Sequence, residues 1–206
     1  MPMQWIATAA FALEGIVARE LRDMGAQNVE AQNGAVRFEG DMTAGLRANL
    51  WLRCCDRVLL EMGRFEARTF DELFEAVRAI EWEALLPVDA AFPVRAKCVR
   101  SQLMSPSDCQ KIVKKAVAER LKSRYGGDWL SETGPVFAID CAIHSDKVEI
   151  TLDSSGVALN RRGYRTWNGE APLRETLAAA LVKLMPWRPD APLLDPCCGT
   201  GTILCE

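Results

Sequence analysis

The chain has 206 residues with a hydrophobic content of 49%, which suits one or two globular domains with modest cores. No apolar run reaches the roughly 18–20 residues of a membrane span, and the N-terminus lacks the pattern of a signal peptide. Eight cysteines without a Cys-x-x-Cys pair and a single histidine argue against a metal site, and they fit reduced thiols in a cytoplasmic protein.

The net charge of −3 is distributed unevenly along the chain. Residues 1–90 hold 9 Arg and Lys against 15 Asp and Glu, whereas residues 91–206 hold 16 against 13. Every lysine lies at or after position 97. This asymmetry predicts that only the second half of the chain faces a polyanion.

Residues 1–66 are predicted to form a β-α-β-β-α-β unit of the ferredoxin-like type. Strand-like and helical patterns alternate along this segment, and Asn33-Gly34 is a strong hairpin signal. The predicted elements are strand Gln4–Ala9, helix Ala12–Met24, strands Val29–Gln32 and Ala35–Glu39, helix Met42–Leu52 and strand Arg57–Phe65. The acidic balance of the unit favours a spacer or an interface over a catalytic body.

A second unit is predicted over residues 67–165. Its strongest element is a helix over Pro106–Tyr125, because Ser105 suits the N-cap, Pro106 suits the first helical position, and Gly126 suits the end. Residues 128–135 are predicted to be a loop and the most mobile stretch. The other predicted elements are helix Thr69–Ile80, with Phe70, Leu73, Phe74 and Val77 facing inward, and strands Ala91–Val99, Val136–His144, Lys147–Asp153 and Val157–Arg162.

Cations gather on the long helix and near it. At 3.6 residues per turn four lysines fall within an arc of roughly 100°, opposite an apolar face. These are Lys111, Lys114, Lys115 and Lys122, and the neighbouring strand and turn add Arg95, Lys97 and Arg100. Such a cluster is typical of a surface that binds a nucleic-acid backbone, although a solvated helix face has the same pattern. Both interpretations stay open at this point.

The segment after the second unit contains a further basic group and a predicted helix. Arg161, Arg162 and Arg165 surround Tyr164, which suits phosphate contact and base stacking as well as it suits a solvated strand end. A helix is predicted to begin near Ala171, with Pro172 in its first turn. Its predicted core stripe is Leu173, Leu177, Leu181 and Leu184.

The last fourteen residues are predicted to form a short buried strand at Leu193 and Leu194, a glycine turn and a helix from Thr202 onward. This order is a nucleotide-binding shape, since glycines let backbone N–H groups approach a ligand. No lysine follows Gly201, as a P-loop requires, and Leu204 occupies the third glycine position of a dinucleotide fingerprint. The acidic Asp195 suits a positively charged ligand group better than a pyrophosphate. An ordinary strand-turn-helix corner is the alternative.

Several stretches resemble two known families. The sequence Asp-Pro-Cys-Cys-Gly-Thr-Gly-Thr at 195–202 resembles the first motif of class I S-adenosylmethionine-dependent methyltransferases, in the form found in enzymes that methylate nucleic-acid amines. Residues 92–103, 107–121, 148–156 and 159–165 resemble a THUMP domain, an RNA-binding module of tRNA- and rRNA-modifying enzymes. With its ferredoxin-like leader, the whole chain is similar to the front part of THUMP-containing class I RNA methyltransferases. Within these, it is most similar to the large-subunit rRNA guanine-amine type, often labelled adenine-specific DNA methylases.

The resemblance implies an α+β fold in three parts: a ferredoxin-like domain at 1–66, a THUMP domain at 67–165, and a linker helix with the opening strand-turn-helix of a Rossmann-like methyltransferase domain at 166–206. It implies S-adenosylmethionine as cofactor, RNA of ribosomal type as partner, and methyl transfer to an exocyclic base nitrogen. The residues that it nominates for the cofactor are Asp195, Pro196, Gly199 and Gly201 from the glycine motif, and Pro172, Leu173 and Thr176 from the start of the preceding helix.

In the resembled enzymes an Asn/Asp-Pro-Pro-aromatic motif orients the reacting amine, and this motif would lie beyond Glu206. The 206-residue chain is therefore expected to bind RNA, to contain no catalytic residue and to be inactive. The alternative is a stand-alone RNA-binding module, because THUMP units also occur beside thiolation, deamination and pseudouridylation domains. The motif at 195–201 favours the enzyme. A nicotinamide-dependent oxidoreductase would rest on the glycine turn alone, and Leu204 disfavours it.

Overall fold

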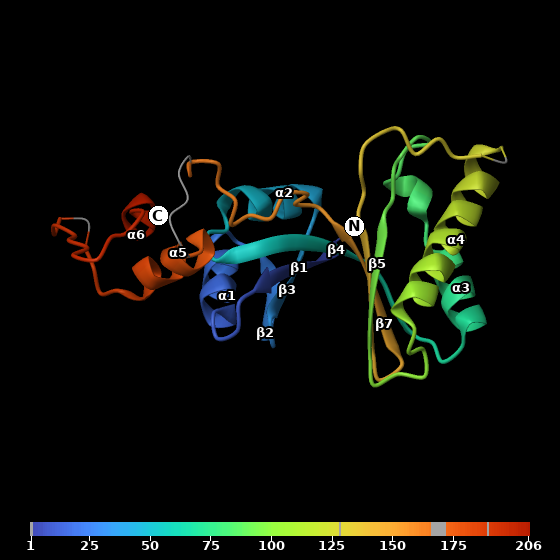
Figure 1. The fold of residues 1–206 in the computed structure, drawn as a ribbon, viewed down its shortest axis with the longest axis horizontal. Helices are drawn as coiled ribbons and strands as arrows, with labels where there is room; N and C mark the ends of the chain where they lie inside the picture. Colours follow the sequence, from blue (N-terminus) through green and yellow to red (C-terminus); the bar gives the residue numbers. More distant parts are fainter. Residues whose placement is uncertain (1, 128, 166–171, 189) are drawn as a thin grey trace. The chain divides into compact units, whose positions relative to one another are not determined.

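The computed structural model describes residues 2–127, 129–165, 172–188 and 190–206, and the chain divides into two compact units. Unit 1 comprises residues 1–59 and 154–206, and unit 2 comprises residues 60–153. Figure 1 shows the elements of each unit in chain order. Among the described residues, no helix combines the length and the apolar character needed to cross a membrane. The domain boundaries at residues 66 and 165 stay a prediction.

The first six elements follow the predicted β-α-β-β-α-β order, which confirms the ferredoxin-like arrangement. Their bounds are β1 Met3–Ala9, α1 Glu14–Asp23, β2 Gln27–Gln32, β3 Ala35–Gly40, α2 Met42–Trp51 and β4 Cys55–Glu66. The strands lie in the order β2-β3-β1-β4, with β3 antiparallel to both β1 and β2. The predicted hairpin turn is present, and Gly34 has the positive φ of 76° that this tight turn requires. Strand β4 begins in unit 1 and continues into unit 2.

Two stacked aromatic rings form the centre of the core in this part of unit 1. Trp5 on β1 and Phe38 on β3 are both buried, with ring centroids 6.4 Å apart. Helix α2 packs against them through Gly45, where an added Cβ would lie 2.3 Å from the Trp5 ring. The absence of a side chain at Gly45 therefore sets how closely α2 approaches the sheet.

The C-terminal part of unit 1 contains α5 (Glu175–Leu184) and α6 (Thr202–Cys205). The prediction that Pro172 lies in the first turn of a helix was wrong, because Arg174 is the N-cap and has an extended backbone. The predicted leucine core stripe was also wrong. Three of its members are exposed, Leu177 by 38%, Leu181 by 40% and Leu184 by 63%.

The buried side of α5 consists instead of small and polar residues. Thr176, Ala178, Ala179 and Ala180 are almost completely inaccessible to solvent. Polar contacts orient the helix this way, since Asp56 accepts hydrogen bonds from Thr176 and from Arg174. These contacts turn the alanine face inward and leave the leucines outside.

Two predicted strands are absent from the described residues. Residues 157–162 form turns, with the Leu159 N–H bonded to the Asp56 carbonyl at 2.8 Å. Leu193 and Leu194 form no strand, and Leu194 is 84% exposed. A strand requires a hydrogen-bonded neighbour, and the described residues offer none to this segment.

Unit 2 contains a sheet with helices on one of its faces (Figure 1). Its remaining elements are α3 Phe70–Ala79, the 3-10 helix η1 Trp82–Ala84, β5 Val94–Val99, α4 Pro106–Tyr125, β6 Ile139–His144 and β7 Lys147–Asp153. The strand order is β4-β7-β6-β5, with β5 parallel to β6 and β6 antiparallel to β7. Helix α4 has the predicted bounds, with Ser105 as its N-cap. Strands β5 and β6 begin three residues later than predicted, because Ala91 and Val136 form only an isolated bridge.

The core of unit 2 lies between the sheet and helices α3 and α4. Leu73 and Val77 of α3 are fully buried, as predicted, and Trp82 lies beneath them with its indole N–H donated to the Val77 carbonyl at 2.9 Å. The inward prediction for Phe70 was wrong, since it is 38% exposed. Phe70 follows the N-cap Thr69, whose capping box fixes the start of the helix at the rim of the core.

The two ion pairs of Glu83 in unit 2 give a pH-dependent prediction. Arg120 and Arg124 both contact the Glu83 carboxylate, and the hydrogen bond from Arg120 lowers the pKa of Glu83 to about 2. Because the folded-state pKa lies below the ordinary value of 4.5, the stabilisation is present at neutral pH and is lost as the pH falls from about 4.5 towards 2.

The variant Glu83→Gln is therefore expected to lower the free energy of unfolding of unit 2 by about 1–2 kcal/mol at pH 7. The difference from the wild type should disappear by pH 2. Urea unfolding followed by pulsed hydrogen exchange, which reports on each unit separately, measures both values. A variant as stable as the wild type at pH 7 would show that the pair is only a surface contact.

Candidate cofactor loop and nucleic-acid interface

The glycine loop, residues 195–202, has the turn geometry predicted from its two glycines. Gly199 and Gly201 have φ values of 53° and 71°, in the left-handed region that favours glycine. The Gly201 N–H bonds to the Cys198 carbonyl at 2.8 Å, and α6 begins at the next residue. A Cβ added at either glycine would meet no heavy atom within 4 Å. The space beside both glycines is therefore open to a ligand.

The other predicted cofactor residues occupy different environments. Asp195 is half-buried and accepts the Cys197 N–H at 3.0 Å, which shapes the start of the loop, while Pro196 is exposed. Thr176 is 3% exposed, and its hydroxyl donates to Asp56 at 3.1 Å. Helices α5 and α6 contact each other, so the structure brings the two predicted halves of the site into one region.

The three arginines around Tyr164 do not share one environment. Arg161 is exposed, whereas the side chains of Arg162 and Arg165 are only 13% and 14% exposed. Arg162 contacts the Arg53 carbonyl and the carboxylate of Glu206. The role of Arg162 and Arg165 in RNA binding stays a prediction, and in this structure both have partners within the protein.

Tyr164 belongs to the same internal network. Its hydroxyl donates to Glu206 at 2.9 Å, and its ring is 39% exposed. Burial and the bond to Glu206 raise the pKa of Tyr164 to about 12, so the phenol stays protonated at neutral pH. Arg53 also contacts Glu206, at 2.7 Å, and the Glu206 side chain is completely inaccessible to solvent.

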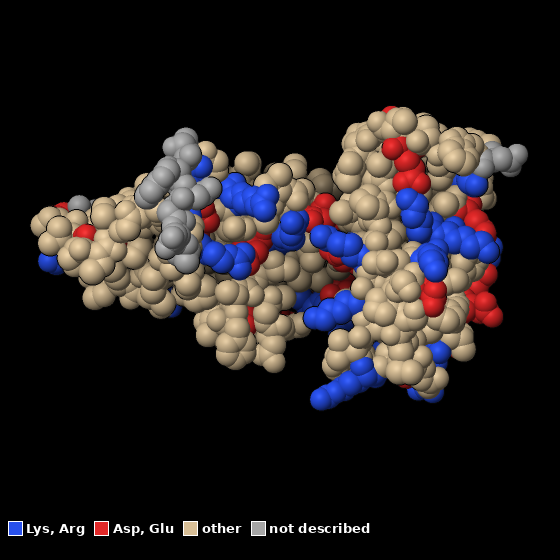
Figure 2. Space-filling view, viewed as in Figure 1, with Lys and Arg blue, Asp and Glu red and all other residues tan. Residues whose placement is uncertain are grey.

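The lysine face of α4 is interspersed with acidic side chains, and Figure 2 shows blue and red atoms side by side on the visible surface of unit 2. The ion pairs are Lys111 with Asp108 at 3.3 Å, Lys114 with Glu132 at 2.7 Å and Lys115 with Glu119 at 3.8 Å. Lys114 also lies 4.8 Å from the centroid of the Phe92 ring. Lys122 makes no ion pair with any residue that the structure describes. Much of the stripe is therefore already balanced by neighbouring charge.

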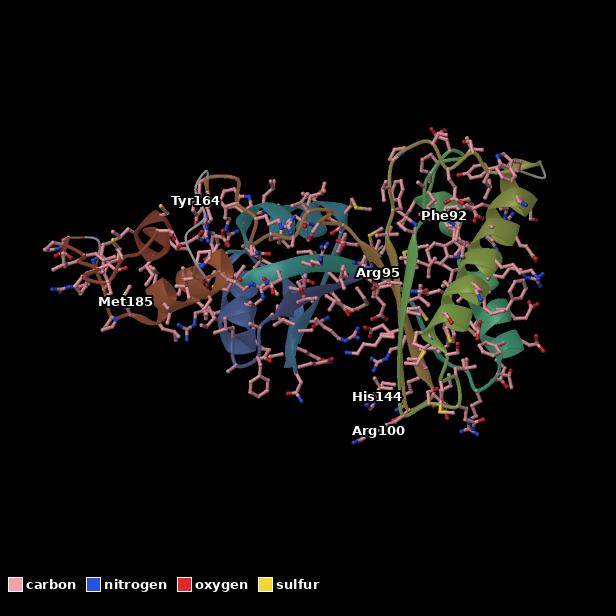
Figure 3. All side chains as sticks on the ribbon, viewed as in Figure 1. Phe92, Arg95, Arg100, His144, Tyr164 and Met185 are labelled. Carbon is pink, nitrogen blue, oxygen red and sulfur yellow. The ribbon has the colours of Figure 1, made fainter. Side chains whose placement is uncertain are left out.

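The cations of β5 lie on the other face of the sheet from α4. Cys98 points towards α4, where its sulfur lies 3.7 Å from that of Cys109, so the adjacent Lys97 points the opposite way. Figure 3 shows Arg95 on the side of β5 away from α4, and Phe92 towards the helix. Arg95 makes two hydrogen bonds to Asp140, at 2.7 and 2.8 Å, and lies 3.6 Å from Asp153. The structure therefore divides the predicted cations between two surfaces.

Sequence reasoning missed two further polar residues on the β5 face. In the strand register Val99 pairs with His144, and His144 pairs with Lys147. His144 and Arg100 lie at the same end of the sheet (Figure 3). The alternation of side chains along each strand could have predicted this placement, because residues paired across neighbouring strands point to the same face of the sheet. Lys97, Arg100, His144 and Lys147 are all exposed.

Three protein-family models match the chain. Residues 4–59 match the RlmL ferredoxin-like domain, residues 67–153 match the THUMP domain, and residues 162–206 match the methyltransferase domain of the RMKL-like type. The order of these matches is the order predicted from the sequence.

Individual relatives agree with the domain matches. "Putative RNA methyltransferase YpsC" of Bacillus subtilis is 51% identical over 203 residues, which is 98% of this chain and 52% of that protein. Ribosomal RNA large subunit methyltransferase K/L of Magnetococcus marinus is 35% identical over 98% of this chain and 29% of that protein.

A solved structure extends the comparison. The crystal structure of SMU.472 complexed with SAH has a TM-score of 0.93 and 41% identity, and the match covers 98% of this chain and 54% of that one. This chain thus spans about half the length of YpsC and of SMU.472. The chain thus matches a ferredoxin-like, a THUMP and a methyltransferase domain model in that order, and over 98% of its length it is similar to proteins named as RNA methyltransferases.

Proposed function

We propose that this chain is the RNA-binding front part of an S-adenosylmethionine-dependent RNA methyltransferase that acts on ribosomal RNA in the cytoplasm. The match of residues 67–153 to a THUMP domain is the observation that carries the proposal. The naming of a relative as a large-subunit rRNA methyltransferase supports the substrate class. We propose the domain limits 1–66, 67–165 and 166–206, with the THUMP domain at 67–165 as the RNA-binding part.

The glycine loop supports the cofactor assignment. SAH is S-adenosylmethionine without its transferable methyl group, and it accompanies the related SMU.472. In this chain, the backbone at Gly199 and Gly201 is open to a ligand, and the half-buried Asp195 carboxylate suits the positively charged amino-acid end of the cofactor. Pro196 and the start of α5, with Thr176, would complete this side of the site.

The proposed reaction is in-line attack by an exocyclic base nitrogen on the methyl group that the cofactor supplies. The contribution of the protein is alignment, since positioning two reactants removes much of the entropic barrier. The RNA-binding half would fix the target base, and the glycine loop would fix the cofactor. No residue of this chain is assigned to orient the amine.

A methyl-transfer assay tests whether this chain binds RNA without catalysing methyl transfer. Incubation of the 206-residue chain with radiolabelled S-adenosylmethionine and large-subunit rRNA is expected to leave the RNA unlabelled, because the amine-orienting motif is absent from the chain. The same preparation should bind that RNA. Labelled RNA would contradict the proposal that the catalytic groups lie outside residues 1–206.

The proposed RNA-binding residues form two groups on unit 2 and one on unit 1. They are Lys111, Lys114, Lys115 and Lys122 on α4, Arg95, Lys97 and Arg100 on β5 and its turn, and Arg161, Arg162 and Arg165 near Tyr164. Among these, Lys97, Arg100, Lys122 and Arg161 make no ion pair with described residues, so they are the cations most available to phosphate.

A charge-removal experiment separates these groups. Changing all four α4 lysines to glutamine is expected to weaken binding of a fluorescent rRNA fragment. It should also reduce the salt dependence of binding, by about 0.7 in the log–log slope for each phosphate that the variant no longer neutralises. A matched variant changes four exposed arginines of unit 1 to glutamine, namely Arg19, Arg22, Arg47 and Arg188.

The comparison of the two variants decides which surface binds. A weaker α4 variant beside a nearly unchanged control supports the helix face. Equal affinities for the wild type and the α4 variant would assign the RNA to the β5 face or to Arg161–Arg165. No binding by the wild type would contradict the proposed function of this chain. RNA binding without any affinity for S-adenosylmethionine would favour a stand-alone RNA-binding module.

A further inference from the structure

Arg165 contacts both the glycine loop and the segment that leads into α5. One terminal nitrogen, Nη2, donates to the Thr202 hydroxyl at 2.9 Å and to the Leu173 carbonyl at 3.0 Å. The Nε atom lies 3.2 Å from the carboxylate of Glu175. The side chains of Arg165 and Glu175 are only 14% and 10% exposed, so these contacts are internal.

These contacts hold the part of the glycine loop whose backbone is the most flexible, the turn through Gly199 and Gly201. Thr202 follows Gly201 directly, is 4% exposed, and its hydroxyl lies 3.1 Å from that of Thr200. Glycine adopts many backbone conformations at little cost, so a turn through Gly199 and Gly201 does not fix itself. Helix α6 has only four residues and adds little stability of its own. The turn therefore depends on contacts from outside the loop.

We propose that Arg165 is a positioning residue that fixes the glycine loop against the start of α5. It would set the distance between the two segments assigned above to S-adenosylmethionine, and to that extent the inference rests on the proposed function. The guanidinium group suits this role because its rigid planar fork holds donors on two nitrogens, Nη2 and Nε, in fixed directions, whereas lysine carries its three N–H donors on one nitrogen. Arg165 is not assigned to contact the reacting atoms.

The surroundings of Arg165 make this arrangement stiff. Three residues before it, Arg162 contacts the Arg53 carbonyl and Glu206, which attaches the same segment to the start of β4 and to the end of α6. On the other side, Thr176 is bonded to Asp56 of β4. Both segments that Arg165 joins are thus attached separately to the ferredoxin-like domain. Removal of the Arg165 guanidinium should loosen the two segments without unfolding that domain.

Hydrogen exchange of the full 206-residue chain tests the inference without any assay of methyl transfer. In the variant Arg165→Met, amides of residues 199–205 and 173–178 are expected to exchange at least about tenfold faster, whereas β1, β3 and α1 keep the wild-type rates. The variant Arg165→Lys should give intermediate rates, because it retains the charge but not all three contacts. The control Arg188→Met changes an arginine whose side chain is 80% exposed, and it should exchange like the wild type.

A second variant keeps the test decisive if Arg165→Met does not fold. Thr202→Val removes one acceptor of Arg165 and retains the shape of the side chain, so it should speed exchange in residues 199–205 and leave residues 173–178 nearly unchanged. Wild-type rates in both segments of Arg165→Met would overturn the inference. Faster exchange throughout unit 1 would also overturn it, since Arg165 would then be a general stabilising residue.

Cofactor binding is measured separately by equilibrium dialysis with labelled S-adenosylmethionine. If the wild type binds it, Arg165→Met is expected to bind at least about tenfold more weakly, with partial recovery in Arg165→Lys. Affinity equal to the wild type would overturn the link between loop position and cofactor. If the wild type does not bind but the exchange result is as expected, the positioning role of Arg165 is supported and the proposed cofactor function fails.

Discussion

The variant Glu20→Ala is expected to lower the free energy of unfolding of unit 1 by about 3–5 kcal/mol. The Glu20 carboxylate on α1 is 6% exposed and accepts the backbone N–H groups of Arg53 and Cys54, at 3.2 and 3.1 Å. It also lies 3.2 Å from the ammonium of Lys183 on α5. Alanine would leave two amides without their acceptor and a lysine without its partner. Urea denaturation with segment-resolved hydrogen exchange measures the decrease in stability.

The isosteric variant Glu20→Gln is the matched control. Its side-chain oxygen can still accept an N–H group, so it should lose roughly half as much stability as alanine. The alanine variant should also expose Cys54, whose thiol has its pKa raised to about 12 by burial and, secondarily, by the charge of Glu20. A thiol-specific reagent would then modify Cys54 faster. An alanine variant within about 1 kcal/mol of the wild type would contradict a structural role for this buried carboxylate.

The variant Gly45→Ala is expected to destabilise unit 1 by about 1–3 kcal/mol, although alanine normally stabilises a helix relative to glycine. An added Cβ would lie 2.3 Å from two carbon atoms of the Trp5 ring. Trp5 is 1% exposed and stacks on Phe38, so the ring cannot move without disturbing the core. Thermal unfolding followed by tryptophan fluorescence and hydrogen exchange measures the effect.

Gly15 on α1 provides the opposite case. It is exposed, and an added Cβ there would meet nothing within 4 Å, so Gly15→Ala is expected to raise stability by about 0.5–1 kcal/mol. The two substitutions are chemically identical and should have opposite signs. A stabilising Gly45→Ala would contradict the close packing of α2 on Trp5.

Local signals in the sequence were sufficient for most of the fold. Helix α4 has the predicted bounds because its N-cap serine, its first-position proline and the following glycine all act within a few residues of its ends. The β2–β3 hairpin followed from Asn33-Gly34 in the same way. The turn at Gly199 and Gly201, where both residues have positive φ values, was likewise predicted from local residue types.

Predictions from the sequence were wrong or incomplete where contacts between residues far apart in the chain decide which side chains are buried. The leucines of α5 are spaced like a core stripe, but the hydrogen bonds that Thr176 and Arg174 donate to Asp56 turn the alanine face inward. Likewise, nothing in the spacing of Arg161–Arg165 indicates that Arg165 contacts Thr202 and Glu175. Such pairings depend on tertiary structure and leave no local pattern to recognise.

The surface on which each basic residue lies could be assigned only once the arrangement of the sheet was known. The prediction grouped Lys97 and Arg100 with the lysines of α4, although side chains alternate along β5. Which face of β5 the helix covers follows from packing, such as the contact between Cys98 and Cys109, and not from charge. The structure therefore leaves two surfaces of unit 2 to be distinguished by experiment.

Ultraviolet cross-linking of the chain to large-subunit rRNA, followed by mass spectrometry of the linked peptides, tests the central claim most directly. That claim is that the THUMP domain binds RNA. The linked peptides are expected to come mainly from residues 95–125, with further links near Arg161, and added salt should abolish them. Links confined to residues 1–59, or none at low salt, would contradict RNA binding by the THUMP domain of this chain.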